Sequence, residues 1–298
     1  FALHGDGIAA ASITRTGGEK PVLDICVFVS GPPGAELLEK TGRELRASHY
    51  HVTTVLAGGE YQILSVDAPN VAADELKTAV RWRLKDMLDF HVDDATIDVL
   101  DIPADKNAAV RTSHGMFAIA ARNSVIEKRQ GMFAAAKVGL SVIDIPEMAQ
   151  RNISALMEPE GRGLAMLSFG ADGGLLTVTF NAELYLSRRI DVTLEQLLDT
   201  DPDRKHACFD KITLELQRSL DHFDRQFHFI SVSKLVLAPT GTTGLDEYLS
   251  SNLYTPVVTM NLGDVLDIDG VPELLDQAAQ QRFFFTLGAA LRHEETLL

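Results

Sequence analysis

The chain has 298 residues, 46% of them hydrophobic and 23% charged, so it can bury a full core without disulfides or structural metals. Its formal net charge of −15 argues against a nucleic-acid partner and against direct binding to an anionic membrane. Its two cysteines, Cys26 and Cys208, lie far apart, which excludes a disulfide framework and favours a reducing, cytosolic compartment.

The first part of the chain predicts three strands, a helix and a fourth strand. Gly5-Asp6-Gly7 between two apolar segments is typical of a β-hairpin, and residues 21–30 form a third strand. Residues 35–48 predict an amphipathic helix and residues 51–58 the next strand. The glycines also fit a loose dinucleotide-binding fingerprint, but no crossover helix follows them, so the hairpin is favoured.

A compact α+β insert of roughly 80 residues follows, at about residues 60–138. It begins with a strand and a long helix over residues 70–90, which Asn70 is placed to cap. Two strands around a polar loop and a second helix complete it. Residues 140–157 then return to the first half, which spans residues 1–158.

The second half, residues 159–298, repeats the same order of elements. Three strands with short turns precede a long helix over residues 204–229. Its apolar positions form one continuous stripe: Phe209, Ile212, Leu216, Leu220, Phe223 and Phe227. A strand, a helix, a strand and a closing helix over residues 273–294 follow. Two copies of one order of elements indicate an internal architectural repeat.

Two glycine-bearing turns of the second half each follow a strand. They are the stretch from Ser168 to Gly174 and the stretch around Gly241 and Gly244. Backbone N–H groups in such turns can bind phosphate, although most glycine turns between strands are only turns. The chain has no Walker motif, no nucleophile elbow and no metal-ligand spacing, so neither a catalytic residue nor a metal site is predicted.

The order of elements is similar to the actin, Hsp70 and sugar-kinase plan. Residues 74–103 resemble the inserted subdomain of type IV pilus assembly proteins of the PilM kind. Residues 214–227, 234–257 and 282–292 resemble the second half of that family in order and spacing, and residues 82–89 resemble its MSHA-biogenesis branch, MshI, more closely. The resemblance implies an α/β, actin-like (ribonuclease H-like) pair of duplicated domains with an inserted α+β subdomain.

The same resemblance implies a cytoplasmic protein that is peripheral to the inner membrane. It would bind the cytoplasmic tail of a bitopic PilN-like partner, or the MSHA counterpart of that partner, and touch the membrane only through it. The resemblance places the partner peptide near Trp82, Leu84, Leu88 and Phe90. Burial of these four residues in the core of the insert is the alternative.

PilM-like proteins bind ATP between their two halves, and the sequence departs from their pattern where the phosphates lie. Ala2 and Ser168 stand where the two metal-side aspartates are expected, and His4 replaces a glycine. Ala238-Pro239 replaces a Gly-Gly pair. Because catalysis on magnesium-bound triphosphate rests on positioning and electrostatics, these losses predict a degenerate cleft and no cofactor.

The degenerate nucleotide-binding residues would be those of the two glycine turns: Gly170, Asp172, Gly173, Gly174, Gly241 and Gly244. Asp172 has two interpretations, a residue of a type I′-like turn or a displaced metal-side acid. The alternative function is a working ATPase of the PilM kind with bound ATP and magnesium, which rests on the glycines that persist.

Overall fold

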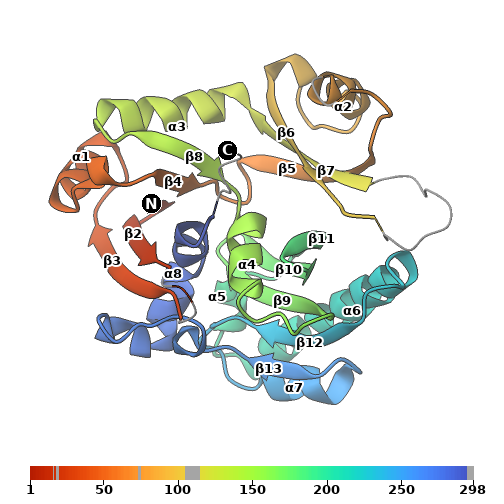
Figure 1. Cartoon of the computed structure of the whole chain (residues 1–298). Helices are drawn as coiled ribbons and strands as arrows, with labels where there is room; N and C mark the ends of the chain where they lie inside the picture. The colour runs from red at the N-terminus through yellow and green to blue at the C-terminus, as the bar shows by residue number, and fades with distance from the viewer. Residues whose placement is uncertain (16, 18–19, 73–74, 105–114, 294–298) are drawn as a thin grey trace. The chain divides into compact units, whose positions relative to one another are not determined.

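The structure is a computed structural model that describes residues 1–293, except residues 16, 18–19, 73–74 and 105–114 (Figure 1). The chain forms two compact units. The first comprises Phe1–Gly31, Thr53–Val55 and Asp144–Leu298, and the second comprises Pro32–Val52 and Leu56–Ile143. The chain passes between them after Gly31, at both ends of the short segment Thr53–Val55 in β4 (Val52–Val55), and near the end of β8 (Leu140–Asp144).

The first unit contains two sheets that begin with the same antiparallel meander. One sheet has the order β1 (Ala2–His4), β2 (Gly7–Thr14) and β3 (Val22–Ser30). The other begins with β9 (Gly163–Gly170), β10 (Gly173–Phe180) and β11 (Glu183–Ile190). It continues with β12 (Val232–Leu237), parallel to β9, and β13 (Val257–Thr259), parallel to β12, so its order is β11-β10-β9-β12-β13.

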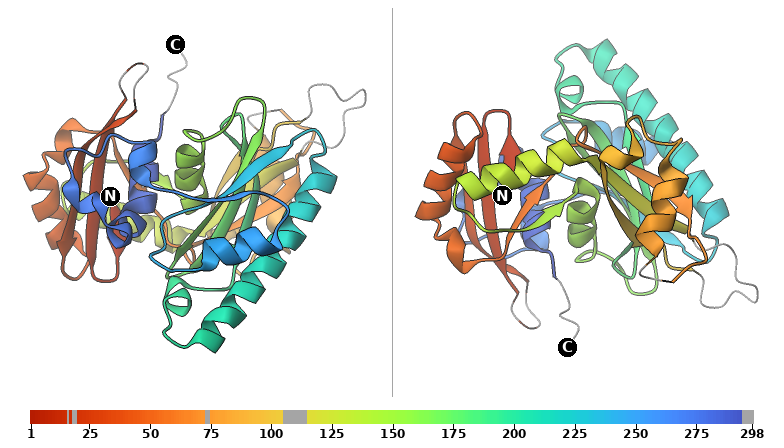
Figure 2. Two further views of the ribbon diagram at one scale, coloured as in Figure 1. Left: turned by 90° about the horizontal axis from the view of Figure 1, so that it is seen from below. Right: turned by 90° about the horizontal axis from the view of Figure 1, so that it is seen from above.

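Helices cover both faces of the five-stranded sheet. Figure 2 shows α6 (Pro202–Gln226) along one face and α4 (Pro146–Ser154) on the other. The predicted apolar stripe of α6 is buried, from Phe209 to Phe223. The remaining helical segments of this unit are α5 (Leu194–Leu197), α7 (Leu245–Asn252), α8 (Gln277–Ala290) and the 3₁₀ turns η3 (Leu262–Asp264) and η4 (Pro272–Leu275).

Helix α8 closes the core of the first unit. Its Phe283, Phe284 and Leu287 belong to one apolar cluster with residues of both sheets, among them Ala9 of β2 and Met166 of β9. The helix approaches α4 so closely that a Cβ on Gly288 would lie 2.2 Å from the carbonyl oxygen of Ala149. A glycine is therefore required where the two helices cross.

The second unit is an antiparallel three-stranded sheet with three helices. The sheet has the order β5 (Tyr61–Asp67), β7 (Gly115–Arg122) and β6 (Ala95–Asp101). The helices are α1 (Ala35–Glu44), α2 (Leu76–Leu84) and α3 (Asn123–Ala135), and 3₁₀ turns lie at η1 (Ala47–His49) and η2 (Val92–Asp94). The partly buried ion pair between Arg129 of α3 and Glu60, 2.7 Å long, ties α3 to the start of β5.

The predicted strands and main helices occur in the predicted order within the described residues, whereas α5 and the 3₁₀ turns were not predicted, and the boundaries change most at three helices. The cap predicted at Asn70 is wrong, because α2 begins at Leu76. The helix predicted over 35–48 ends at Glu44, since Arg46 takes a left-handed conformation (φ 53°). The closing helix is split, because Asp276 caps α8 and the preceding residues form η4.

The predicted insert, residues 60–138, lies within the second unit, and the limits predicted for the two halves stay predictions. Nearly all of the insert's predicted polar loop, residues 105–114, lies outside the described residues. No helix in the described part of the chain combines the length and the apolar character that a bilayer crossing needs.

Candidate functional site

The turn between β9 and β10 is a tight hairpin in which Gly170 pairs with Gly173. Ala171 and Asp172 form the turn and are exposed, and Gly173 has a positive φ of 106°. A type I′ turn needs positive φ at both central residues, so Asp172 is a turn residue but not of the type I′ kind that we expected. That geometry occurs one hairpin later, at Asn181 (φ 51°) and Ala182 (φ 59°).

Two glycines of this hairpin, Gly173 and Gly174, pack closely against residues of β9 and β11. A Cβ on Gly173 would lie 2.7 Å from the carbonyl oxygen of Ile190, and one on Gly174 would lie 2.8 Å from the ring of Phe169. Both positions are buried. Packing within the sheet therefore accounts for these two glycines, with no need for a phosphate beside them.

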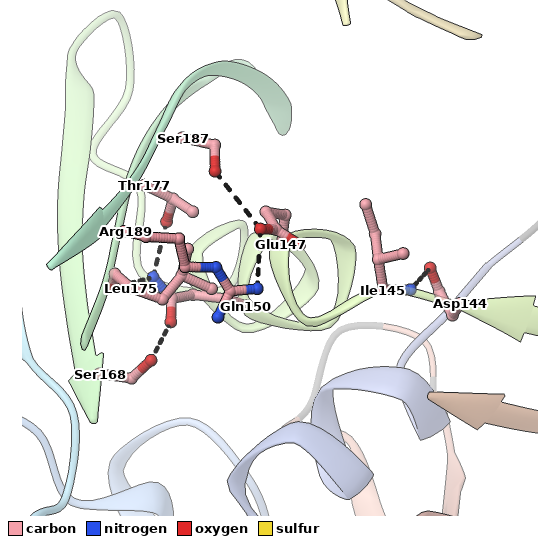
Figure 3. Close-up of polar contacts among 9 residues, drawn as sticks. All are labelled: Asp144, Ile145, Glu147, Gln150, Ser168, Leu175, Thr177, Ser187 and Arg189. Atoms are coloured by element: carbon pink, nitrogen blue, oxygen red, sulfur yellow. Dashed lines mark hydrogen bonds and ion pairs between the residues drawn. The ribbon is translucent and has the colours of Figure 1, made fainter. Parts of the chain in front are cut away.

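Ser168, which stands where a metal-side aspartate is expected, is buried against α4. Its hydroxyl donates a 2.5 Å hydrogen bond to Oε1 of Gln150, which is fully buried (Figure 3). The Gln150 amide in turn donates to the carbonyl oxygens of Met166 (2.9 Å) and Leu175 (3.2 Å) and to Oγ1 of Thr177 (2.8 Å). Ser168 is therefore bonded to a neutral side chain inside the fold.

Side chains of the same unit contact the first hairpin, where Gly5 and Asp6 connect β1 to β2. Arg282 of α8 forms a 3.1 Å ion pair with Asp6 and stacks over the ring of Phe28, 4.3 Å from its centroid. His4 meets the same ring edge-on at 5.9 Å. Burial lowers the pKa of His4, an effect that Asp6 opposes and Arg282 reinforces.

Two consecutive residues of α8 bond to the two hairpins. Gln281 donates a 3.1 Å hydrogen bond to the carbonyl oxygen of Phe169 beside the second hairpin, and Arg282 pairs with Asp6 in the first. The resemblance to PilM-like proteins implies that these hairpins would face the phosphates of a nucleotide. Here a cation that could serve a phosphate is paired with a carboxylate of the chain.

The third predicted segment, around Gly241 and Gly244, lies between β12 and α7. Ala238 is buried, and its N–H donates to the carbonyl oxygen of Leu167, which continues the pairing with β9. Gly241 (φ 69°) has no atom within 4 Å of where a Cβ would stand, and Gly244 (φ 85°) precedes the first residue of α7. Both glycines therefore have a positive φ, a backbone conformation that glycine adopts without strain.

Helix α4 carries a polar stripe that the sequence reasoning missed. Glu147 is fully buried, forms a 3.0 Å ion pair with Arg189 and accepts a 3.5 Å hydrogen bond from Ser187 (Figure 3). Asp144, just before the helix, accepts the N–H of Ile145 and pairs with Arg292 of the segment after α8. The signal was the spacing of Glu147, Gln150 and Ser154, three and four residues apart on one helix face.

The structure separates the four residues predicted to line a peptide groove. Trp82 is 71% exposed, which contradicts its burial in the insert core, whereas Leu84 is fully buried. Leu88 and Phe90 are partly buried against the core of the second unit, and Arg122 covers the ring of Phe90 at 4.4 Å. Trp82 is the accessible member of the set.

Metal ligands do not gather in the part of the chain that the structure describes. Within it, no three His, Cys, Asp or Glu side chains come together as a metal site would require.

Comparison with known proteins yields a fold but no sequence family. No family model and no curated protein sequence matches the chain. Among solved structures, a chain of the "PilM-PilN type IV pilus biogenesis complex" superposes with a TM-score of 0.75 at 19% identity, covering 97% of this chain and 96% of that one. The chain therefore has the predicted actin-like α/β fold, in the form found in that complex.

Two further structures are more distant. The cytoplasmic domain of EpsL, an inner-membrane component of the type II secretion system of Vibrio cholerae, gives a TM-score of 0.43 at 13% identity and covers 83% of this chain and 97% of that one. A protein of unknown function with an actin-like ATPase fold, from Bacteroides thetaiotaomicron, gives 0.49 at 11% identity and covers 92% and 94%. Scores this low carry no argument about function.

Proposed function

We propose that this chain is an actin-like scaffold of type IV pilus biogenesis, of the MSHA type, that works without hydrolysing ATP. It would lie in the cytoplasm, held at the inner membrane by the cytoplasmic tail of a PilN-like partner. The observation that carries this proposal is the superposition on the PilM-PilN complex over almost the whole of both chains. The resemblance of residues 82–89 to MshI supports the MSHA assignment.

The polar contacts at the two hairpins support a scaffold without nucleotide. The Ser168 hydroxyl is engaged by Gln150, and Arg282 is paired with Asp6. A triphosphate with magnesium needs metal-side carboxylates and free donors at this place. Calorimetry with Mg-ATP is the test: no heat at millimolar nucleotide is expected, and saturable binding at micromolar nucleotide would contradict the proposal.

Trp82 is the anchor that we propose for the partner peptide. It is the sole tryptophan of the chain and exposes 71% of its surface, so its fluorescence reports on the site. Buried tryptophans at interfaces commonly contribute most of the binding energy. A peptide of the partner's cytoplasmic tail, made without tryptophan, is expected to shift Trp82 emission to shorter wavelength in a saturable way.

Matched variants separate this contact from a general surface effect. Trp82→Leu is expected to weaken the peptide at least tenfold in calorimetry. Tyr50→Leu, which removes another exposed aromatic of the second unit (48% exposed), is expected to leave affinity within twofold. Peptide binding that is indifferent to Trp82→Leu would remove Trp82 from the site, and no binding of any kind would overturn the scaffold function.

One observation favours the alternative, an ATP-binding protein of the PilM kind. The loop with Gly241 and Gly244 keeps its positive-φ glycines, and space remains open beside Gly241. Binding of ATP abolished by Gly241→Leu but kept in the exposed-loop control Gly59→Leu would support this function.

A further inference from the structure

The five-stranded sheet has β11 at one edge and β13 at the other, and β13 borders an open groove. The groove has a volume of about 570 Å³ and lies between α7 and β13. Its lining consists of Asp246, Glu247, Ser250 and Ser251 of the helix and of all three residues of the strand. None of the residues discussed at the two hairpins lies in it.

The direction of the backbone groups of β13 follows from its pairing with β12. The carbonyl of Pro256 accepts from the N–H of Leu235, and the N–H of Met260 donates to the carbonyl of Leu237. Backbone groups alternate sides along a strand, so Val258 also faces β12. The N–H and C=O groups of Val257 and Thr259 therefore point away from the sheet, toward the free edge.

These outward groups form no backbone hydrogen bond among the described residues. An edge strand with unpaired N–H and C=O groups is a template for another extended chain. Native proteins often protect such an edge with lysine, proline within the strand or a bulge. The strand is short, at three residues, which itself limits pairing, but Val257, Val258 and Thr259 include no lysine, proline or bulge, and Val258 is 37% exposed.

The negative charge of the groove favours a positively charged partner segment. Its seven lining residues include two carboxylates, Asp246 and Glu247, and no lysine or arginine. The chain as a whole carries −15. A second copy of this chain would bring the same carboxylates to the edge, so like charges would oppose pairing between copies. A cationic segment would be attracted.

We propose that β13 binds a short, extended, basic peptide segment of a partner protein, which adds as a sixth strand to the sheet. Val257 and Thr259 supply the backbone hydrogen bonds, and Asp246 and Glu247 receive a lysine or arginine of the segment. Tyr254, whose side chain is fully exposed just before the strand, lies at the entry of the segment. This surface is separate from Trp82, so the proposal does not depend on the scaffold function.

The test uses the full chain and a fluorescently labelled synthetic peptide, Lys-Val-Lys-Val-Thr-Val-Lys, followed by fluorescence anisotropy. The same peptide with glutamate in place of lysine is expected to bind at least tenfold more weakly. A third peptide is N-methylated at alternate residues. It keeps its charge, but the backbone N–H donors along one edge of the extended chain are lost. It is also expected to lose at least tenfold in affinity, because strand addition requires those donors.

Variants of the protein locate the contact. The double variant Asp246→Lys, Glu247→Lys is expected to weaken the cationic peptide at least tenfold and to strengthen the glutamate peptide. The control Asp221→Lys, Asp224→Lys makes the same charge change on exposed positions of α6 and is expected to stay within twofold. Circular dichroism of each variant confirms that it is folded.

Three results would overturn the proposal. The first is no binding of the cationic peptide at 1 mM, and the second is equal binding of the N-methylated peptide. The third is a concentration-dependent dimer in sedimentation that Thr259→Pro abolishes, since the occupant of the edge would then be a second copy.

Discussion

Ser168 donates its hydroxyl hydrogen to the amide oxygen of Gln150, and both side chains are buried at a position where the resemblance to PilM-like proteins places a metal-side aspartate. The pair joins β9 to α4 across 18 residues of sequence. An uncharged pair can be buried at little cost when every polar atom is bonded, whereas a lone carboxylate there would need a cation. Ser168 and Gln150 are thus part of the buried core.

Gln150→Leu is expected to lower the free energy of unfolding by about 2–4 kcal/mol, because it leaves Ser168 and Thr177 without their buried partner. Urea denaturation followed by circular dichroism measures the change. Gln226→Leu at the exposed end of α6 is the control and should shift stability by less than about 0.5 kcal/mol. Equal effects in the two variants would show that the Gln150 network contributes nothing.

Two glycine-to-alanine substitutions in helices are expected to have opposite effects. Gly288→Ala places a methyl group against the backbone of Ala149 and should destabilise the fold by about 2–4 kcal/mol. Gly131→Ala, in the exposed interior of α3 with nothing within 4 Å, should stabilise it by about 0.5–1 kcal/mol. Thermal unfolding of the two variants compares them directly, and a stable Gly288→Ala would mean that α8 does not cross α4 so closely.

Removing Arg189 is expected to be costly, because its partner Glu147 is fully buried. Arg189→Met should destabilise the chain by about 2–3 kcal/mol, somewhat less than a fully buried pair because Arg189 is one-third exposed. Arg204→Met removes an exposed pair with Asp199 and should cost less than about 1 kcal/mol. If guanidinium denaturation shows a larger loss of stability for Arg204→Met than for Arg189→Met, the buried ion pair on α4 does not stabilise the fold.

His4 should make the fold more stable at neutral than at mildly acidic pH. Burial lowers its pKa in the folded chain below the unfolded value of 6.5. The unfolded chain therefore binds more protons as the pH falls through that value, and stability declines. His4→Leu should reduce the difference in unfolding free energy between pH 7.5 and pH 5.5. The exposed His51→Leu should leave that difference unchanged.

The strand order was predictable because its signals are local. Gly5-Asp6-Gly7 and the alternating apolar segments identify hairpins within a few residues, and the α6 stripe repeats from Phe209 to Phe227, over about five turns. The absence of the expected metal-side acid at Ser168 was also readable from one position. What replaces it was not, because Gln150 and Arg282 come from other parts of the chain.

The sequence left open whether Trp82 is exposed or buried, for a related reason. Helix α2 has nine residues, and its buried side is set by Val80 and Leu84. The cap expected at Asn70 lies five residues before the observed N-cap, Glu75, and the apolar residues of so short a helix are too few to define one face from the sequence. The bonds at Arg81, whose guanidinium reaches two carbonyl oxygens of residues 92–95, fix the orientation through contacts that no periodicity reveals.

The place of α8 in the sequence sets the order in which the protein can be completed on the ribosome. Strands β1 to β3 emerge long before the aromatic residues that cover them, Phe283 and Phe284. At 5–20 residues per second this delay is on the order of ten seconds or more. During it the first sheet has an uncovered apolar face, so the nascent chain is a natural client for chaperones, and truncation before Gln277 should yield aggregates instead of a smaller folded protein.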